Sequence, residues 1–179
     1  MKILKIILIA IAVIIVIPMI IALFGADSYS VEREVTINKP KQEVFSYIKL
    51  LKNQSNYSKW VMMDPNAKMT YTGTDGTVGF TSAWNSENKN VGQGEQTISK
   101  ITEGDRMDLD LHFIKPFDGR ATSYMSTEAL AENQTKVKWG FNGKMNYPMK
   151  VMHLFMNMEK MIGDDLATGL ANLKRVMEK

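Results

Sequence analysis

Three side chains that can bind metals or transfer protons are spaced two residues apart near the middle of the chain: Asp108, Asp110 and His112. Alternate residues of a strand share one face, so two carboxylates and an imidazole could there hold a divalent ion or exchange protons. The intervening residues are apolar, which is the pattern of a half-buried strand whose polar face meets solvent. We therefore expect this trio to be solvated, and it predicts no metal and no cofactor.

Two further pairs could contact a bound molecule. Arg120 and Tyr124 share a strand face, where they could meet a carboxylate or a phenolic oxygen in a cavity; the alternative is a surface pair. His153 and Asn157 fall in the last predicted helix, where the imidazole could orient the polar head of a ligand. The alternative for His153 is a partly exposed helix residue.

The spacings of common catalytic motifs are absent from the sequence. It contains no cysteine, no Gly-x-Ser-x-Gly elbow and only two separated histidines. The glycines at Gly73, Gly76 and Gly79 lack the Lys-Ser/Thr and the strand-to-helix context of a phosphate loop. These absences argue against acyl transfer, zinc hydrolysis and nucleotide binding.

An uncharged, almost wholly aliphatic run extends from Ile6 to Ala26, after Lys2 and Lys5. Twenty helical residues span roughly the 30 Å of a bilayer core. The run therefore predicts that residues 1–26 form a single-pass transmembrane anchor. The two lysines favour a cytoplasmic amino end, which would put the rest of the chain on the periplasmic or extracytoplasmic side of the inner cell membrane.

A cleaved signal peptide is the alternative for this run. Its apolar region would be shorter, and cleavage after Ala26 would put the bulky Phe24 where a small side chain is preferred. We therefore expect an anchor, followed by a short stalk at 27–30 and one domain at 31–179. The net charge of +3 includes Lys2 and Lys5, so the domain is nearly neutral, which argues against nucleic acid as a partner.

Short alternating segments separated by turn residues dominate the domain. Val31 to Ile37 predicts a strand, and Pro40 opens a helix that should end near Asn53. A single long helix is predicted after Pro148. Between the helices the pattern is typical of an antiparallel meander, with strands expected at 68–72, 77–84, 91–102, 106–114, 119–130 and 135–145.

The stretch from Val31 to Phe45, with its proline-led helix and Val-Phe pair, resembles the start of the helix-grip superfamily. This superfamily (SRPBCC) includes START-like, birch-allergen-like and polyketide cyclase/dehydrase-like proteins. Asn56 to Trp60 resembles its short second helix, and Gly140 to Met145 with the last helix resembles its end. The resemblance implies an α+β helix-grip fold: a curved seven-stranded antiparallel sheet around a long C-terminal helix, with two short helices after strand 1.

The resemblance also implies a cavity for apolar or amphipathic small molecules between the sheet and the last helix. Strand alternation and helical spacing indicate which side chains would line it. The expected positions are Val78, Phe80, Trp84, Leu109, Leu111, Phe113, Tyr124, Val137, Trp139, Phe141, Met152, Phe155, Met158 and Ile162.

The leading interpretation is a membrane-anchored domain that binds a lipid-like small molecule without catalysis or a cofactor. One alternative is an enzyme resembling polyketide cyclases or dehydrases, in which the pocket enforces geometry. Another is a protein-interaction module that uses the outer sheet face or exposed loops. The sequence indicates no particular protein partner.

Overall fold

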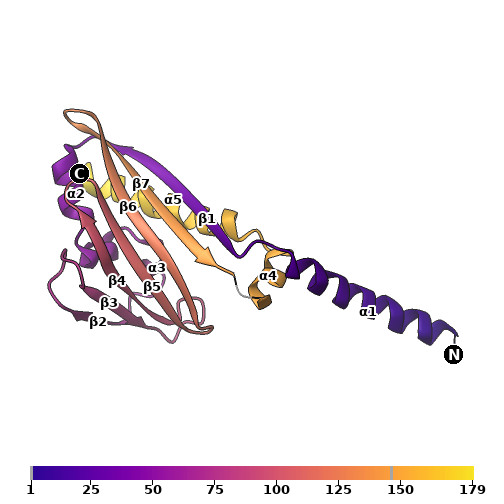
Figure 1. Cartoon of the computed structure of the whole chain (residues 1–179). Coiled ribbons are helices and arrows are strands. Elements are labelled where there is room, and N and C mark those ends of the chain that lie inside the picture. The colour runs from indigo at the N-terminus through magenta and orange to yellow at the C-terminus, as the bar shows by residue number, and fades with distance from the viewer. Residues whose placement is uncertain (1, 146) are drawn as a thin grey trace.

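The computed structural model describes residues 2–145 and 147–179, with side chains at 3–5, 11–145, 147, 150–152 and 154–179. The predicted anchor includes Ile6 to Ala10, and His153 is one of the predicted ligand contacts. The side chains of these residues lie outside the part of the chain that the structure describes. The chain begins with α1 (Lys2–Leu23), a helix that projects away from the domain (Figure 1). Among the described residues, no helix combines the length and the apolar character needed to cross a bilayer.

The domain consists of seven strands and several helices. In chain order they are β1 (Ser28–Ile37), α2 (Lys41–Ile48), η1 (Leu51–Asn56, a 3₁₀ helix), α3 (Lys59–Met62), β2 (Lys68–Thr72), β3 (Thr81–Asn85), β4 (Gln93–Thr102), β5 (Arg106–Lys115), β6 (Gly119–Ala131), β7 (Gln134–Lys144), α4 (Tyr147–His153) and α5 (Met158–Met177).

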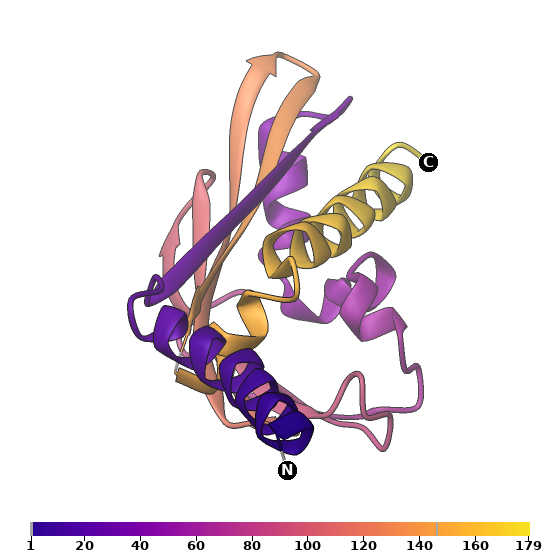
Figure 2. The ribbon, with the colours of Figure 1, turned by 90° about the vertical axis from the view of Figure 1, so that its right-hand side faces the viewer.

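The strands form one antiparallel sheet in the order β1-β7-β6-β5-β4-β3-β2. The first strand, β1, lies at one edge of the sheet beside the last strand, β7. The strands from β2 to β7 are neighbours in chain order, so the predicted antiparallel meander is confirmed. Helices α2, η1, α3 and α5 lie on one side of the sheet (Figure 2). We call this side the inner face. The α+β architecture with a long C-terminal helix is the one expected of a helix-grip fold.

The predicted stalk at 27–30 is mostly strand. β1 starts at Ser28, and its first three residues pair with Asn142 to Lys144 of β7. The alternation visible in the sequence starts only at Val31, because Ser28 and Ser30 are exposed polar residues on an edge strand. The first domain helix also ends earlier than predicted, at Ile48, and the chain continues as a separate 3₁₀ helix.

The sequence predicts one unbroken helix after Pro148, and this prediction is wrong, because the chain breaks between α4 and α5. The second of the two helices, α5, is the long one. Asn157 precedes α5, and its side-chain oxygen accepts a hydrogen bond from the backbone N–H of Lys160 at 2.8 Å. This cap satisfies an amide that has no partner within the helix, so it favours a new helix start. The apolar spacing continues through the break, which is why it does not reveal the interruption.

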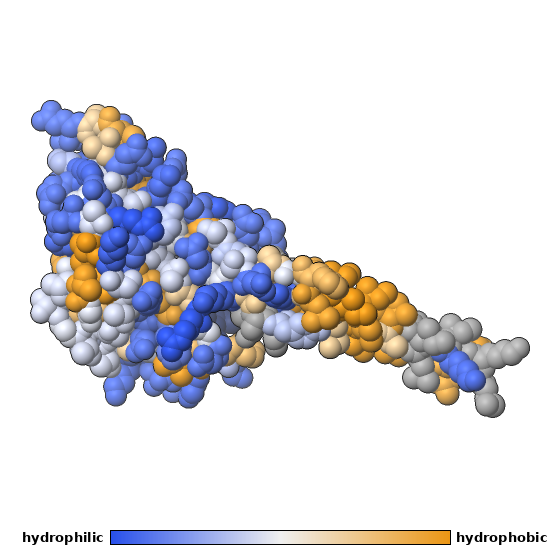
Figure 3. All heavy atoms as spheres, viewed as in Figure 1, coloured by the Kyte–Doolittle hydropathy of each residue, from blue (hydrophilic) through white to orange (hydrophobic). Residues whose placement is uncertain are grey.

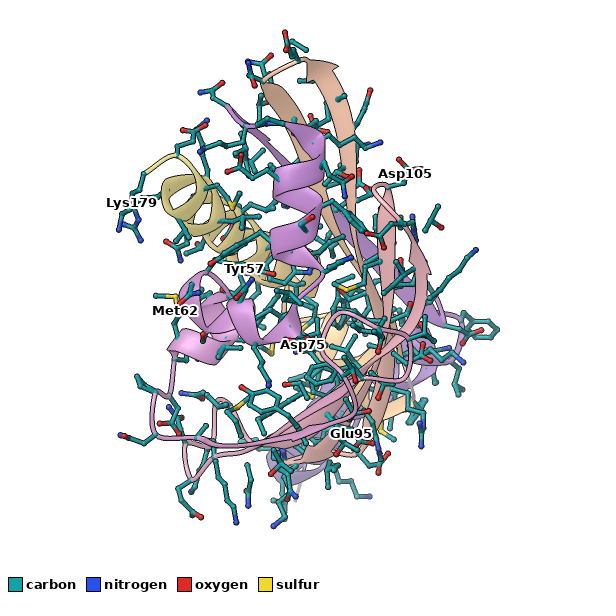
Figure 4. All side chains as sticks on the ribbon, turned by 90° about the vertical axis from the view of Figure 1, so that its left-hand side faces the viewer. Tyr57, Met62, Asp75, Glu95, Asp105 and Lys179 are labelled. Carbon is teal, nitrogen blue, oxygen red and sulfur yellow. The ribbon has the colours of Figure 1, made fainter. Side chains whose placement is uncertain are left out.

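Most of the core lies between α5 and the end of the sheet formed by β1 and β7. Leu166, Leu170 and Leu173 of α5 are almost fully buried there. A second buried cluster lies under η1 and comprises Leu51, Phe80, Ile98, Met107 and Leu109. Asp75 holds η1 over this cluster by accepting hydrogen bonds from the backbone N–H groups of Leu51 (2.8 Å) and Lys52 (3.2 Å) (Figure 4).

Candidate functional site

The inner face carries most of the positions that the sequence predicts for a cavity. Val137, Trp139 and Phe141 of β7 point inward and are buried in the main core, while Phe80 and Leu109 belong to the cluster under η1. Ile162 of α5 is half-buried and packs against the main core, and Met158 is half-buried one turn earlier. Packing therefore fills the part of the inner face that α5 covers.

Another part of the inner face, on β3 to β5, is covered less completely. We call Trp84, Leu111 and Phe113 the inner apolar patch; all three are half-buried. The rings of Trp84 and Phe113 meet edge to face, with their centroids 6.1 Å apart. Gly94 lies between them on β4, where a Cβ atom would come within 2.5 Å of the Trp84 ring. A missing side chain thus lets the two aromatic rings approach each other.

The inner apolar patch stays accessible because α5 lies across another part of the sheet. α5 packs chiefly against β1, with smaller contacts to β7, α3 and η1. The helix therefore leaves apolar side chains of the middle strands with an incomplete covering. Sites for apolar molecules are lined mainly by hydrophobic and aromatic side chains, which are the types present here.

Buried polar side chains border this patch, and the sequence analysis missed them. Gln96 is paired with Ser82 on one side and Leu111 on the other in the sheet register, and its Nε2 donates to Oε1 of Gln54 at 2.7 Å. Gln54, Gln96 and Ser82 are all buried. The detectable signal is Gln96 at an inward position between Gly94 and Ile98. Nothing in the local sequence of Gln54 indicates burial.

Trp139 is the centre of an aromatic cluster on the covered part of the inner face. Tyr57 and Trp60 each contact its ring edge to face, with centroids 5.8 Å away. Its indole N–H donates to the hydroxyl of Ser123 at 3.1 Å, and this hydroxyl donates to the carbonyl of Gly140 at 2.8 Å. The buried ring therefore has its one polar atom satisfied.

Tyr57 is a buried phenol that the sequence analysis did not single out. Its side chain points from the short helices into the core (Figure 4), and its hydroxyl donates to the sulfur of Met125 at 3.6 Å, a weak acceptor. Burial raises the pKa of Tyr57 well above the ordinary tyrosine value, so the group stays protonated at physiological pH.

Four of the expected cavity positions do not lie on the inner face of the sheet. Val78 is 60% exposed in the turn before β3, because the strand starts at Thr81 and not at Thr77. Met152 and Phe155 are 46% and 72% exposed, because the break before α5 removes them from its buried stripe. Tyr124 lies on the outer face, because its β6 neighbours Ser123 and Met125 point inward.

The outer face also holds the trio with metal-binding chemistry. Asp108 pairs with the Arg106 guanidinium at 2.7 Å, and His112 Nε2 lies 3.2 Å from Asp118. Among the described residues, no group of three or more His, Cys, Asp or Glu side chains is placed to hold a metal ion. Asp110 points outward between the other two members of the trio and is exposed.

Tyr124 joins a network of charges on the outer face. Its hydroxyl donates to the Glu32 carboxylate, its ring lies 3.8 Å from the Arg106 guanidinium, and Lys138 Nζ lies 3.2 Å from Glu32. The ring lies across Gly140, where any Cβ atom would overlap it. The hydrogen bond from Tyr124 lowers the pKa of Glu32, while partial burial and the bond to Glu32 raise the pKa of Tyr124.

We expect this network to give a pH-dependent contribution to stability. A depressed Glu32 pKa means that the contribution is present above the unfolded value of about 4.3 and is lost as pH falls through the folded pKa. The raised Tyr124 pKa means that its part is present below about pH 10 and is lost above the folded pKa. Unfolding of wild type and Glu32→Gln should therefore differ most between these limits, and a difference that does not change with pH would contradict the assignment.

Two surface depressions lie outside the inner face. One, of about 300 Å³, lies on the outer face beside Arg106, Asp108 and Tyr124. The other, of about 490 Å³, lies between the start of β2 and the β3–β4 turn, beside Asp64 and Glu87. Polar and charged residues make up most of the lining of both. Neither depression is lined by a residue of the inner apolar patch.

Comparison with known proteins identifies the family of the chain. The model of the family described as "Polyketide cyclase / dehydrase and lipid transport" matches residues 28–178, from the first residue of β1 to just beyond the end of α5. The chain belongs to this family. No curated protein matches the sequence.

Solved structures with the same fold share little sequence with this family member. A protein from Nitrosospira multiformis is 14% identical with a TM-score of 0.60, and the match covers 83% of this chain and 96% of that one. The Aha1 dimer from Colwellia psychrerythraea is 13% identical (TM-score 0.56; 84% and 96% covered). DynU16, a putative protein in the dynemicin biosynthetic locus, is 12% identical (TM-score 0.59; 87% and 48% covered). At these identities the likeness shows the fold alone.

Proposed function

We propose that this family member binds a hydrophobic or amphipathic, lipid-like small molecule on its inner face. The observation that carries the proposal is the inner apolar patch, whose aromatic and aliphatic surface is incompletely covered beside the buried Gln54–Gln96 pair. The patch would contact the apolar part of the ligand, and the amides would provide hydrogen bonds at its border. The family description, which includes lipid transport, supports this ligand class.

The proposed binding involves no chemistry on the ligand. A cyclase- or dehydrase-like enzyme is the second candidate, and the buried Tyr57 is the observation that favours it. A protonated phenol can donate a hydrogen bond to a ligand carbonyl and so polarise it. Its hydroxyl, however, points at Met125 inside the filled core and away from the inner apolar patch. Recovery of a bound molecule unchanged after long incubation would favour binding over catalysis.

We also propose that residues 1–26 hold the domain at a membrane, with the domain on the extracytoplasmic side. Support comes from the uncharged run after Lys2 and Lys5 and from the exposed aliphatic side chains of α1, such as Ile14 (70% exposed) and Leu23 (61%). The expected result is an intact mass that includes residue 1 and a chain that stays with the membrane after alkaline washing. A mature protein that starts near Asp27 would refute the anchor.

Native mass spectrometry of the detergent-extracted full chain tests the ligand proposal. We expect a co-purifying small molecule, and we expect Phe113→Asp to lower its affinity by roughly tenfold or more, because an apolar contact worth about 1.4 kcal/mol is replaced by a charge. Leu130→Asp is the matched control, since Leu130 is an exposed apolar residue in the β6–β7 hairpin. Repeated preparations without any bound molecule, together with no uptake from a lipid panel, would refute the proposal.

A further inference from the structure

The segment that joins α4 to α5 exposes a cluster of large apolar side chains. We call it the junction patch; it comprises Met152, Leu154, Phe155, Met156 and Met161. Phe155 is 72% exposed and the others are between 42% and 48% exposed. A contiguous exposed group of this kind marks a contact surface more often than a free one. From Val151 to Met158 the sequence contains no Asp, Glu, Lys or Arg; Lys150 precedes this stretch, and Glu159 and Lys160 follow it before Met161.

Helix α4, which precedes most of the junction patch, is directly connected to α1. The Tyr147 hydroxyl of α4 donates to the backbone carbonyl of Met19 at 3.1 Å, and Ala22 is only 1% exposed. Lys150 donates to the carbonyl of Gly25 at 3.0 Å and forms an ion pair with Asp27. These contacts tie α4 to the end of α1, and the junction patch begins at the end of α4.

The surrounding surface differs from this junction. Figure 3 shows apolar side chains along α1 up to the point where it meets the domain, whose visible face is mainly hydrophilic. Figure 1 places α4 beside that end of α1, and the β6–β7 hairpin at the opposite end of the sheet. The apolar side chains of α1 therefore lead to the end of the domain where α4 lies.

We propose that the junction patch inserts into the acyl-chain boundary of the lipid leaflet next to the end of α1. The inference rests on the proposed membrane location and adds a second contact to it. Exposed Phe, Leu and Met side chains, such as the run from Leu154 to Met156, can enter the boundary between headgroups and acyl chains. Lys160, whose side chain is 71% exposed, would remain at the level of anionic headgroups. Thioethers suit such a surface, because methionine adapts to irregular apolar surroundings.

This arrangement gives the lipid contact a structural consequence. Met158 and Ile162 lie beside Met161 in the first turns of α5, and Ile162 packs against the main core. The junction patch is therefore continuous along the chain with the inner side of α5. The proposed lipid contact would therefore lie next to the start of α5.

Single-cysteine labelling tests the proposal, because the natural chain contains no cysteine. Phe155→Cys, Ile14→Cys and Leu130→Cys are each labelled with a polarity-sensitive fluorophore on the full chain. Each labelled chain is then reconstituted in vesicles of phosphatidylcholine and phosphatidylglycerol, with or without lipids that carry an acyl-chain spin-label quencher. Ile14 reports on α1 itself, and Leu130 reports on an exposed apolar site far from the junction.

We expect the Phe155 label to shift to the blue and to lose emission to spin-labelled lipid to an extent comparable with the Ile14 label. The Leu130 label should show neither change. Quenching at Ile14 without quenching at Phe155 would overturn the junction contact and leave the anchor intact. No quenching at either position would refute the membrane location as well. The Phe155 label could instead shift to the blue as the amount of protein per vesicle rises, without quenching by the spin-labelled lipid. This result would indicate a second copy of the chain as the occupant, and would also overturn the proposal.

Discussion

Replacing Trp139 by alanine is expected to lower the free energy of unfolding by about 3–5 kcal/mol, the range for truncating a large buried aromatic side chain. Trp139 is only 4% exposed and lies between Tyr57, Trp60 and α5. Gly169 of α5 brings the helix backbone close to this ring, because a Cβ atom there would come within 2.7 Å of it. The helix cannot move inward to fill the cavity without losing its other core contacts.

Urea unfolding of the full chain in a mild non-ionic detergent, followed by circular dichroism, measures this loss. Trp60→Ala is the matched control, since Trp60 contributes one edge-to-face contact to Trp139 but is only half-buried. Its cost should be clearly smaller. Equal costs for the two substitutions would show that Trp139 is not the residue on which α5 and the short helices converge.

Replacing Gln96 by leucine is expected to lower stability by about 1–3 kcal/mol, because it leaves the buried Gln54 carbonyl without its donor. Leucine is close to glutamine in volume, so the change tests the hydrogen bond more than the packing. The double variant Gln54→Leu/Gln96→Leu removes both polar groups, and we expect it to recover much of the lost stability.

Chemical denaturation of wild type, the two single variants and the double variant completes a double-mutant cycle. Additive costs would mean that the Gln54–Gln96 hydrogen bond contributes nothing to stability. The same variants also report on function. If the amides border the ligand site as proposed, the double variant should fold well and bind the co-purifying molecule more weakly than wild type.

Strand assignment from the sequence worked well where the chain alternates with a period of two. Val137, Trp139 and Phe141 are predicted inward and are buried, and the carboxylates Asp108 and Asp110 are predicted outward and lie on the outer face. This local geometry is a property of the extended backbone and does not depend on the partner strands. The same reasoning, applied to Tyr124 itself, places it outward, because its neighbours Ser123 and Met125 alternate inward.

The composition of the site depends on contacts that no local pattern contains. Gln54 and Gln96 are far apart in the chain and meet only when η1 packs over β4. Trp84 approaches Phe113 because Gly94, on the strand between them, has no side chain. Such positions become visible only when the strand register is known.

The sequence by itself determined the order of the strands, the family, and the uncharged run at the amino end, because each depends on residue types at short and regular spacing. Tertiary structure alone decided which inward side chains α5 covers, since one helix packed chiefly on β1 leaves Trp84, Leu111 and Phe113 half-buried. It also decided that the last helix breaks after α4. An apolar stripe records that residues prefer to leave water, whereas the three-dimensional arrangement of the backbone sets what covers them.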